Sequence, residues 1–218
     1  MQSSLQIKNL QLFRQESLLL NLNEHIMGGE ILTIMGPSGS GKSSLLNWLT
    51  GTLSNNFKVT GEVWLNGKNM NNQPSHLRQM GVLYQDALLF SHLTVAGNIA
   101  FSMPKGNKKY RQEKIEHALE QVGLKGIGRY HPDHLSGGQQ ARVALLRVLL
   151  SEPKAILLDE PFSKLDTQLR IDTRQLVFDQ IREHQLPAIM VTHDHSDAEA
   201  TKNKVLTLGN KQGDSYVR

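Results

Sequence analysis

Apolar and polar residues alternate over residues 5–10, which is the pattern of a strand with one buried face. Residues 63–67 predict another strand, which ends in a turn. Successive side chains of a strand point to opposite faces of a sheet. We therefore expect an antiparallel β portion in this part of the chain.

Four other short runs are almost wholly apolar, which is typical of central strands covered by helices on both faces. They lie at residues 31–35, 82–84, 155–158 and 188–191. Segments with helical signals separate them, at residues 113–122, 139–150 and 167–184, and each is followed by a glycine or a proline. Strands that alternate with helices predict an α/β fold with a mostly parallel sheet.

Residues 86–150 contain no convincing strand, so we expect them to form a helical subdomain inserted into the sheet. A chain of 218 residues is long enough for one α/β domain and short for two. The sequence thus predicts a single domain over residues 1–218. Its core is formed by residues 1–85, with the antiparallel β portion, and by residues 151–218.

The composition excludes several kinds of functional site and disfavours others. There is no cysteine, which excludes disulfides, thiolate zinc sites and a cysteine nucleophile. No apolar run approaches the ~18 residues of a membrane span, so work at a membrane would need another subunit. The 24 Lys and Arg residues exceed the 20 Asp and Glu residues but are spread along the chain, which disfavours a nucleic-acid surface.

A glycine-rich loop follows the apolar run at residues 31–35 and precedes a helical pattern with Leu45, Leu46 and Leu49 on one face. Such a loop lets backbone N–H groups converge on a phosphate. Lys42 is expected to reach the β- and γ-phosphates of a nucleotide, and Ser43 to bind Mg²⁺. The flanking pattern argues against an ordinary glycine turn. The predicted phosphate-binding residues are Gly36, Pro37, Ser38, Gly39, Ser40, Gly41, Lys42, Ser43 and Ser44.

The apolar run at residues 155–158 ends in Asp159 and Glu160. Ligands of open α/β sheets bind at the carboxyl ends of the strands. We expect Asp159 to hold Mg²⁺ and Glu160 to act as general base on the attacking water. Acidic residues also commonly cap a following helix, so the two carboxylates alone are weak evidence of a catalytic site. Together with the phosphate loop upstream they become strong evidence.

The segment from Leu135 to Gln139, Leu-Ser-Gly-Gly-Gln, begins a second helical pattern with an anion-binding character. By itself it could be a flexible helix cap. The order of phosphate loop, this segment and the Asp159-Glu160 strand resembles the nucleotide-binding domain of the ABC family. The resemblance covers nearly the whole chain, and Leu135 to Gln139 match the signature motif of that family.

The resemblance implies roles for three further residues. Phe13 would stack on adenine in place of the usual tyrosine, although it could also be core packing. Gln85 matches a glutamine that contacts Mg²⁺ or its water. His193, after the run at residues 188–191, matches a histidine that contacts the γ-phosphate, whereas a histidine here could also have only a structural role.

The resemblance also implies a dimer in which two ATP molecules lie between two copies of the chain, or between this chain and a similar one. The signature residues Ser136, Gly137, Gly138 and Gln139 of one copy would face the phosphate loop of the other. Asp166 would lie near the partner subunit. Lys164 stands where the family more often has a small residue.

Residues 86–100 resemble the importer branch of the family. This implies a transmembrane permease, a solute-binding protein, and a location on the cytoplasmic face of the inner membrane. Leu88, Leu89 and Phe90 could dock the permease or could simply pack in the helical subdomain. A soluble ABC ATPase that acts on nucleic acid or the ribosome, a small-molecule kinase and an exporter subunit are the alternatives.

Overall fold

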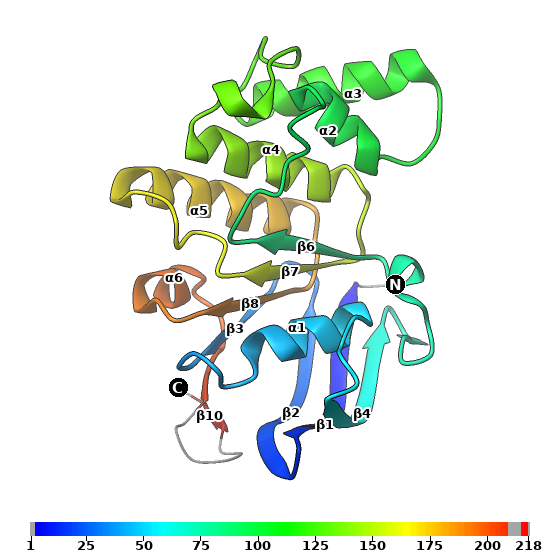
Figure 1. The fold of residues 1–218 in the computed structure, drawn as a ribbon, viewed down its shortest axis with the longest axis vertical. Helices are drawn as coiled ribbons and strands as arrows, with labels where there is room; N and C mark the ends of the chain where they lie inside the picture. Colours follow the sequence, from blue (N-terminus) through cyan, green and yellow to red (C-terminus); the bar gives the residue numbers. More distant parts are fainter. Residues whose placement is uncertain (1–2, 209–214, 218) are drawn as a thin grey trace. The chain divides into compact units, whose positions relative to one another are not determined.

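The computed structural model describes residues 3–208 and 215–217. The chain divides into two compact units. The first comprises Met1–Met80, Lys154–Glu160 and Gln180–Arg218, and the second comprises Gly81–Pro153 and Pro161–Asp179. Figure 1 shows the elements of both units. The subdomain bounds expected from the sequence, residues 86–150 within 1–218, stay a prediction.

The first unit contains an antiparallel sheet in the order β2-β1-β4-β5. Its strands are β1 (Ser4–Arg14), β2 (Ser17–Met27), β4 (Phe57–Leu65) and β5 (Lys68–Asn69). In β1 the alternation places Leu5 and Ile7 in the core, where Leu5 lies opposite Ile26 of β2. The predicted antiparallel β portion is therefore present. Strand β2 was not predicted, although Leu20 and Leu22 do alternate there with exposed residues.

The first unit also contains a largely parallel sheet, in which neighbouring strands follow the order β10-β9-β3-β8-β7. Its strands are β3 (Ile31–Met35), β7 (Ala155–Asp159), β8 (Ala188–Thr192), β9 (Val205–Leu208) and β10 (Ser215–Val217). Strands β3, β7, β8 and β9 run parallel, while β10 is antiparallel to β9. Because parallel strands end at one edge, the segments after β3, β7 and β8 are brought together there.

Two helices of the first unit flank this sheet (Figure 1). Helix α1 (Lys42–Thr50) packs against β7, and α6 (His195–Ala200) packs against β8. A short 3₁₀ turn, η1 (Ser75–Leu77), lies shortly before Met80, where the first of the three stretches of this unit ends. All five residues of β3 and of β8 are buried, as their apolar runs predicted.

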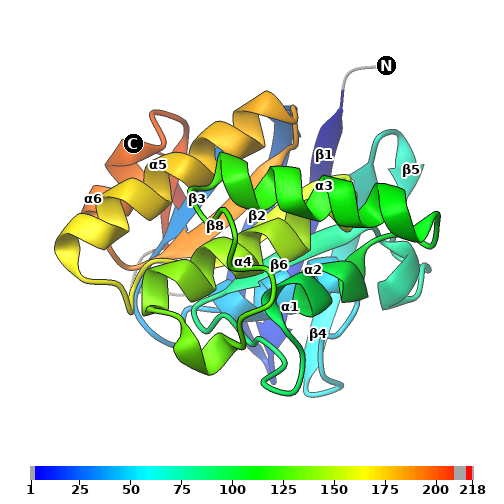
Figure 2. The ribbon, with the colours of Figure 1, turned by 90° about the horizontal axis from the view of Figure 1, so that it is seen from above.

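The second unit is mainly helical, and none of residues 86–150 lies in a strand, as expected. Its elements are β6 (Met80–Tyr84, whose first residue belongs to the first unit), α2 (Val95–Ser102), α3 (Lys108–Gln121), η2 (Pro132–His134), α4 (Gly137–Leu149) and the first part of α5 (Thr167–Glu183). Figure 2 shows these helices from above.

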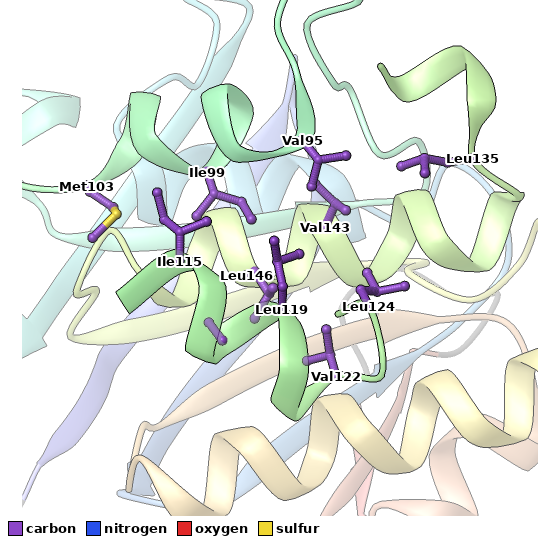
Figure 3. Packing of buried hydrophobic residues seen from close by; sticks show 11 residues of the cluster. Val95, Ile99, Met103, Ile115, Leu119, Val122, Leu124, Leu135, Val143 and Leu146 are labelled. Carbon is purple, nitrogen blue, oxygen red and sulfur yellow. The ribbon is translucent and has the colours of Figure 1, made fainter. Parts of the chain in front are cut away.

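Helices α2, α3 and α4 surround one apolar core. Figure 3 shows Val95 and Ile99 of α2 together with Leu119 of α3 and Val143 and Leu146 of α4. The exposed fraction of each of these side chains is 2% or less. Burial of this kind stabilises a domain by about 25 cal/mol per Å² of apolar surface, so the core gives the second unit its own stability.

Two helices begin earlier than their apolar periodicity predicted. Helix α3 begins at Lys108 instead of residue 113, because the Asn107 side chain accepts hydrogen bonds from the N–H groups of Lys109 and Tyr110. Helix α4 begins at Gly137 instead of residue 139, because Ser136 caps it. Capping side chains satisfy N–H groups that precede the periodic part of a helix.

Candidate nucleotide-binding and hydrolysis site

The glycine-rich loop joins the end of β3 to the start of α1, as the sequence predicted. Gly39 and Gly41 both have left-handed backbones, with φ of +83° and +93°. A Cβ at Gly41 would lie 3.3 Å from the Leu19 Cβ. Glycine therefore suits position 41 both because it tolerates a left-handed backbone and because it leaves room for Leu19. No side chain caps the N-terminus of α1. The first N–H groups of α1 can therefore donate hydrogen bonds to an anion bound in the loop.

Lys42 lies inside the curve of this loop, with 7% of its surface exposed. Its Nζ donates hydrogen bonds to the carbonyl oxygens of Gly36 at 2.6 Å and Pro37 at 2.9 Å. Burial lowers the pKa of Lys42, and the nearby carboxylates of Glu160 and Asp159 oppose this shift. A half-desolvated ammonium at this position attracts phosphate more strongly than one in water.

Ser40 provides a second sign that the loop fits a phosphate. Its Oγ is buried and has no hydrogen-bond partner among the residues that the structure describes. A buried hydroxyl without a partner costs roughly 1–3 kcal/mol, and a phosphate oxygen at this position would accept its hydrogen bond. From the sequence this residue was predicted only as part of the loop, whereas its burial follows from the fold.

Two side chains suited to Mg²⁺ meet at the carboxyl edge of the sheet. The Ser43 Oγ lies 3.4 Å from Oδ1 of Asp159, where β7 ends. Burial, and then the charge of Glu160, raise the pKa of Asp159, while Ser43 and Lys42 oppose the shift. A divalent cation would relieve this cost, and hydroxyl and carboxylate oxygens are ligands that Mg²⁺ accepts. Among the described residues no group of three His, Asp or Glu side chains could hold a metal ion.

Glu160 and His193 form a pair next to these groups. Oε2 of Glu160 lies 3.1 Å from Nδ1 of His193, which follows β8. Glu160 has a left-handed φ of +47°, and its N–H donates to the Val191 carbonyl at 3.0 Å. Non-glycine residues in this conformation are strained and cluster at functional sites. The first unit thus brings together Lys42, Ser43, Asp159, Glu160 and His193.

Phe13 lies at the end of β1, half-buried, and pairs with Leu18 of β2. Its neighbour Leu12 lies near the phosphate loop, because a Cβ at Gly41 would be 3.8 Å from Leu12 Cδ2. The end of the β1–β2 hairpin therefore adjoins the phosphate loop. Whether Phe13 stacks on adenine stays a prediction.

The signature segment lies in the second unit, at the start of α4. Ser136 and Gln139 form a capping box in which Ser136 N–H donates to Gln139 Oε1 at 2.9 Å and Gln139 N–H donates to Ser136 Oγ at 3.3 Å. The Gln139 side chain thus stabilises its own helix, which the sequence reading missed. Gly137 is exposed, whereas Gly138 is buried against Leu169.

Gln85 and Asp166 also lie in the second unit. Gln85 follows β6 and is exposed. Asp166 precedes α5, and its Oδ1 accepts a hydrogen bond from the Leu169 N–H at 3.1 Å. Asp166 therefore caps α5. The roles that the family resemblance implies for both residues stay predictions.

The apolar residues after Gln85 divide between surface and core. Leu88 is 58% exposed, while Leu89 packs against the helical core. The ring of Phe90 lies 4.9 Å from that of Phe101 in an edge-to-face arrangement. Arg147 of α4, which the sequence reading did not single out, donates to the backbone carbonyls of this segment. Leu89 thus packs in the helical subdomain, and docking of the permease by this segment stays a prediction.

A phosphate loop between strand and helix, with two carboxylates at the end of another strand of the same sheet, defines the class of P-loop ATPases. The family model described as ABC transporter matches residues 19–163. The chain belongs to the ABC transporter family. It is accordingly an ATP-binding subunit of that family and an ATP hydrolase.

Three relatives show how far the likeness extends. The chain is 48% identical to the uncharacterized ABC transporter ATP-binding protein YnjD of Escherichia coli K12, over 89% of this chain and 90% of that protein. It is 39% identical to the thiamine import ATP-binding protein ThiQ of Haemophilus influenzae, over 92% of this chain and 93% of that protein. It is 42% identical to the Fe(3+) ions import ATP-binding protein FbpC of Serratia marcescens, over 87% of this chain and 55% of that protein.

No helix in the described part of the chain is both long enough and apolar enough to cross a membrane.

Proposed function

We propose that this chain is the ATPase subunit of a bacterial importer and drives solute uptake through a separate permease. The observation that carries the proposal is the convergence of Lys42, Ser43, Asp159, Glu160 and His193 at one edge of the parallel sheet. The printed names of ThiQ and FbpC, which are import ATP-binding proteins, support the direction of transport. They favour import over export and over a role on nucleic acid.

Binding of ATP would use the loop and its surroundings. The N–H groups of the loop and of α1, the ammonium of Lys42 and the hydroxyl of Ser40 would hold the phosphates. Phe13 would stack on the adenine. Ser43, Asp159 and Gln85 would hold Mg²⁺ together with phosphate oxygens and water. The ion would neutralise the charge of the β- and γ-phosphates.

Hydrolysis would proceed by attack of a water oxygen on the γ-phosphorus, with cleavage of the bond to the β–γ bridging oxygen. Glu160 would accept the proton of the water as general base. His193, already 3.1 Å from Glu160, would orient this carboxylate and contact the γ-phosphate. The strained backbone at Glu160 and its bond to Val191 fix the direction from which the carboxylate acts.

The site would be completed by a second copy of the chain. Ser136, Gly137, Gly138 and Gln139 of one copy would contact the γ-phosphate bound by Lys42 of the other, and Asp166 would lie near the same boundary. Two features support this assignment: Ser136 and Gly137 are exposed, and the space around a Cβ at Gly137 is open. A helix N-terminus presented in this way suits an anion brought by a partner.

ATP would then be the substrate of hydrolysis and would also hold two copies of the chain together as a dimer. Their association and separation would move a transmembrane permease. A solute-binding protein would deliver the solute to that permease. The chain would work at the cytoplasmic face of the inner membrane.

The experiment combines hydrolysis with self-association. Glu160→Gln keeps the shape of the side chain but removes the base, so we expect hydrolysis to fall about 10²- to 10⁴-fold. The variant should sediment as a dimer with ATP and Mg²⁺ and as a monomer without them. Glu24→Gln removes a carboxylate that pairs with Lys204 in the same unit and serves as the matched control. A Glu160→Gln variant that stays monomeric with ATP and Mg²⁺ would contradict the dimer model.

A second experiment tests the permease. The chain should co-sediment with membranes only when its permease is co-expressed, and Mg²⁺ removal by a chelator should abolish hydrolysis. Membrane binding in the absence of any permease would contradict this part of the proposal.

A further inference from the structure

The segment that follows Gln85, residues 86–90, is tied to α4 by Arg147. The guanidinium donates to the carbonyl oxygen of Leu88 at 2.6 Å and to that of Ala87 at 2.9 Å. Leu88 has a left-handed backbone with φ of +46°. These bonds hold one side of the segment, which we call the post-glutamine loop, to the helix that begins with the signature residues.

Lys164 holds the other side of the post-glutamine loop. Its Nζ forms an ion pair with Oδ1 of Asp86, the residue directly after Gln85. Lys164 belongs to the short segment that leads into α5 and ends at Asp166. The bond thus joins two segments that are 78 residues apart in sequence. A small side chain at position 164 could not reach Asp86.

Side-chain packing does not fill the space between these segments. A cavity of about 150 Å³ is lined by the post-glutamine loop, by the start of α4 and by the segment before α5. Thr173 of α5 lines it as well, and its Oγ1, in a residue 1% exposed, has no hydrogen-bond partner among the described residues. A space of this size, lined by both polar and apolar side chains, has room for a few water molecules. Because water fills it less rigidly than side chains would, a direct bond between its walls has more influence on their relative position.

We propose that Lys164 is a positioning residue for ATP hydrolysis, and that its ion pair with Asp86 makes the post-glutamine loop and the segment before α5 move as one body. A displacement of Gln85 on nucleotide binding would then also displace Asp166, and a displacement of Asp166 would displace Gln85. The inference rests on the proposed function, because it assigns Gln85 and Asp166 to the hydrolysis cycle. Lys164 would act through Asp86 and not by contact with the nucleotide or the attacking water.

The test measures steady-state ATP hydrolysis by the purified full chain. Both charged side chains are more than half exposed, so their removal should leave folding intact and shift the melting temperature by no more than about 4 °C. We expect Lys164→Ala and Asp86→Asn each to lower kcat about two- to fivefold, the range of an exposed ion pair worth up to roughly 1 kcal/mol. The KM for ATP should stay the same, because the phosphate loop is not altered.

Rescue and salt dependence separate positioning from a merely structural role. Lys164→Arg keeps the charge and should retain kcat, and the exchange Lys164→Asp with Asp86→Lys should restore it to within about twofold. Salt screens exposed charges, so kcat of the wild type should fall between 0.05 and about 1 M salt more steeply than kcat of Lys164→Ala. Lys109→Ala removes another exposed ion pair, with Glu113 on α3, and is the matched control.

The outcomes are distinguishable from failure of the proposed function. If the wild type hydrolyses ATP and Glu160→Gln does not, the proposed function stands whatever Lys164 does. An unchanged kcat in Lys164→Ala would then overturn the inference alone. A loss of kcat that the charge exchange does not restore would overturn it too, because Lys164 would then act through some other contact.

Discussion

The two adjacent glycines of the signature segment should respond in opposite ways to the same substitution. At Gly137 a Cβ would meet no atom within 4 Å, whereas at Gly138 it would lie 2.3 to 2.6 Å from three carbons of the Leu169 side chain. Contacts between carbon atoms are optimal at about 3.5–4.0 Å. Gly138→Ala therefore forces Leu169, the N-terminus of α4 or both to move, and Gly137→Ala forces nothing.

The magnitude follows from a difference between the two variants. Alanine is favoured over glycine in a helix by up to about 1 kcal/mol, and both variants receive this gain. Only Gly138→Ala suffers overpacking, which costs about 1–3 kcal/mol. Gly137→Ala should thus be as stable as the wild type or slightly more stable. Gly138→Ala should be less stable than Gly137→Ala by about 1–3 kcal/mol, or about 2–10 °C in Tm.

Urea denaturation and calorimetry of the nucleotide-free chain measure this difference. Leu169→Ala provides the internal test, because removing the Leu169 side chain makes room for the new methyl group. In the Leu169→Ala background the difference between the two alanine variants should shrink to nearly zero. Equal stability of Gly137→Ala and Gly138→Ala, or a difference that persists without the Leu169 side chain, would refute the packing argument.

Two further predictions concern the first unit. Burial and Glu160 raise the pKa of Asp159 above 3.8, so the folded chain binds this proton more tightly than the unfolded chain, and the charged carboxylate costs stability at pH 7. Asp159→Asn should raise the Tm of the nucleotide-free chain by about 1–3 °C at pH 7. This gain in Tm should vanish as the pH falls toward 3.8, because Asp159 is then protonated in the folded chain as well. A gain in Tm that calorimetry finds to be independent of pH would contradict the prediction. Arg78, 6% exposed, donates to four backbone carbonyl oxygens, two of them in the last turn of α1. Arg78→Met should therefore lower the free energy of unfolding by roughly 3 kcal/mol in urea, whereas the exposed control Lys202→Met should leave it unchanged.

The parts of the fold that were predictable are those with a local signal. The strand at Ile31–Met35 was predicted with its observed bounds, because a short apolar run between turn residues has one reading in an α/β chain. Helix α5 was predicted to within one residue of its end. Strand β2 was missed although its residues alternate, and the starts of α3 and α4 were placed too late because capping residues lie outside the apolar period.

The sequence by itself determined the chemistry of the site. The spacing of glycines, Lys42 and Ser43, and the two carboxylates after an apolar strand, need only a few consecutive residues to be recognised, because each motif acts through its own backbone and side chains. Strand ends were enough to place these motifs at one edge of a parallel sheet.

Only the tertiary structure decided which of these groups meet. The contact of Ser43 with Asp159, the pair of Glu160 and His193, and the bond of Lys164 to Asp86 join residues that are far apart in sequence. Such contacts depend on strand order and on how loops leave the sheet, and local pattern carries no information on either. For the same reason Gly137 and Gly138 look alike in the sequence and differ in the fold, because only one of them faces Leu169.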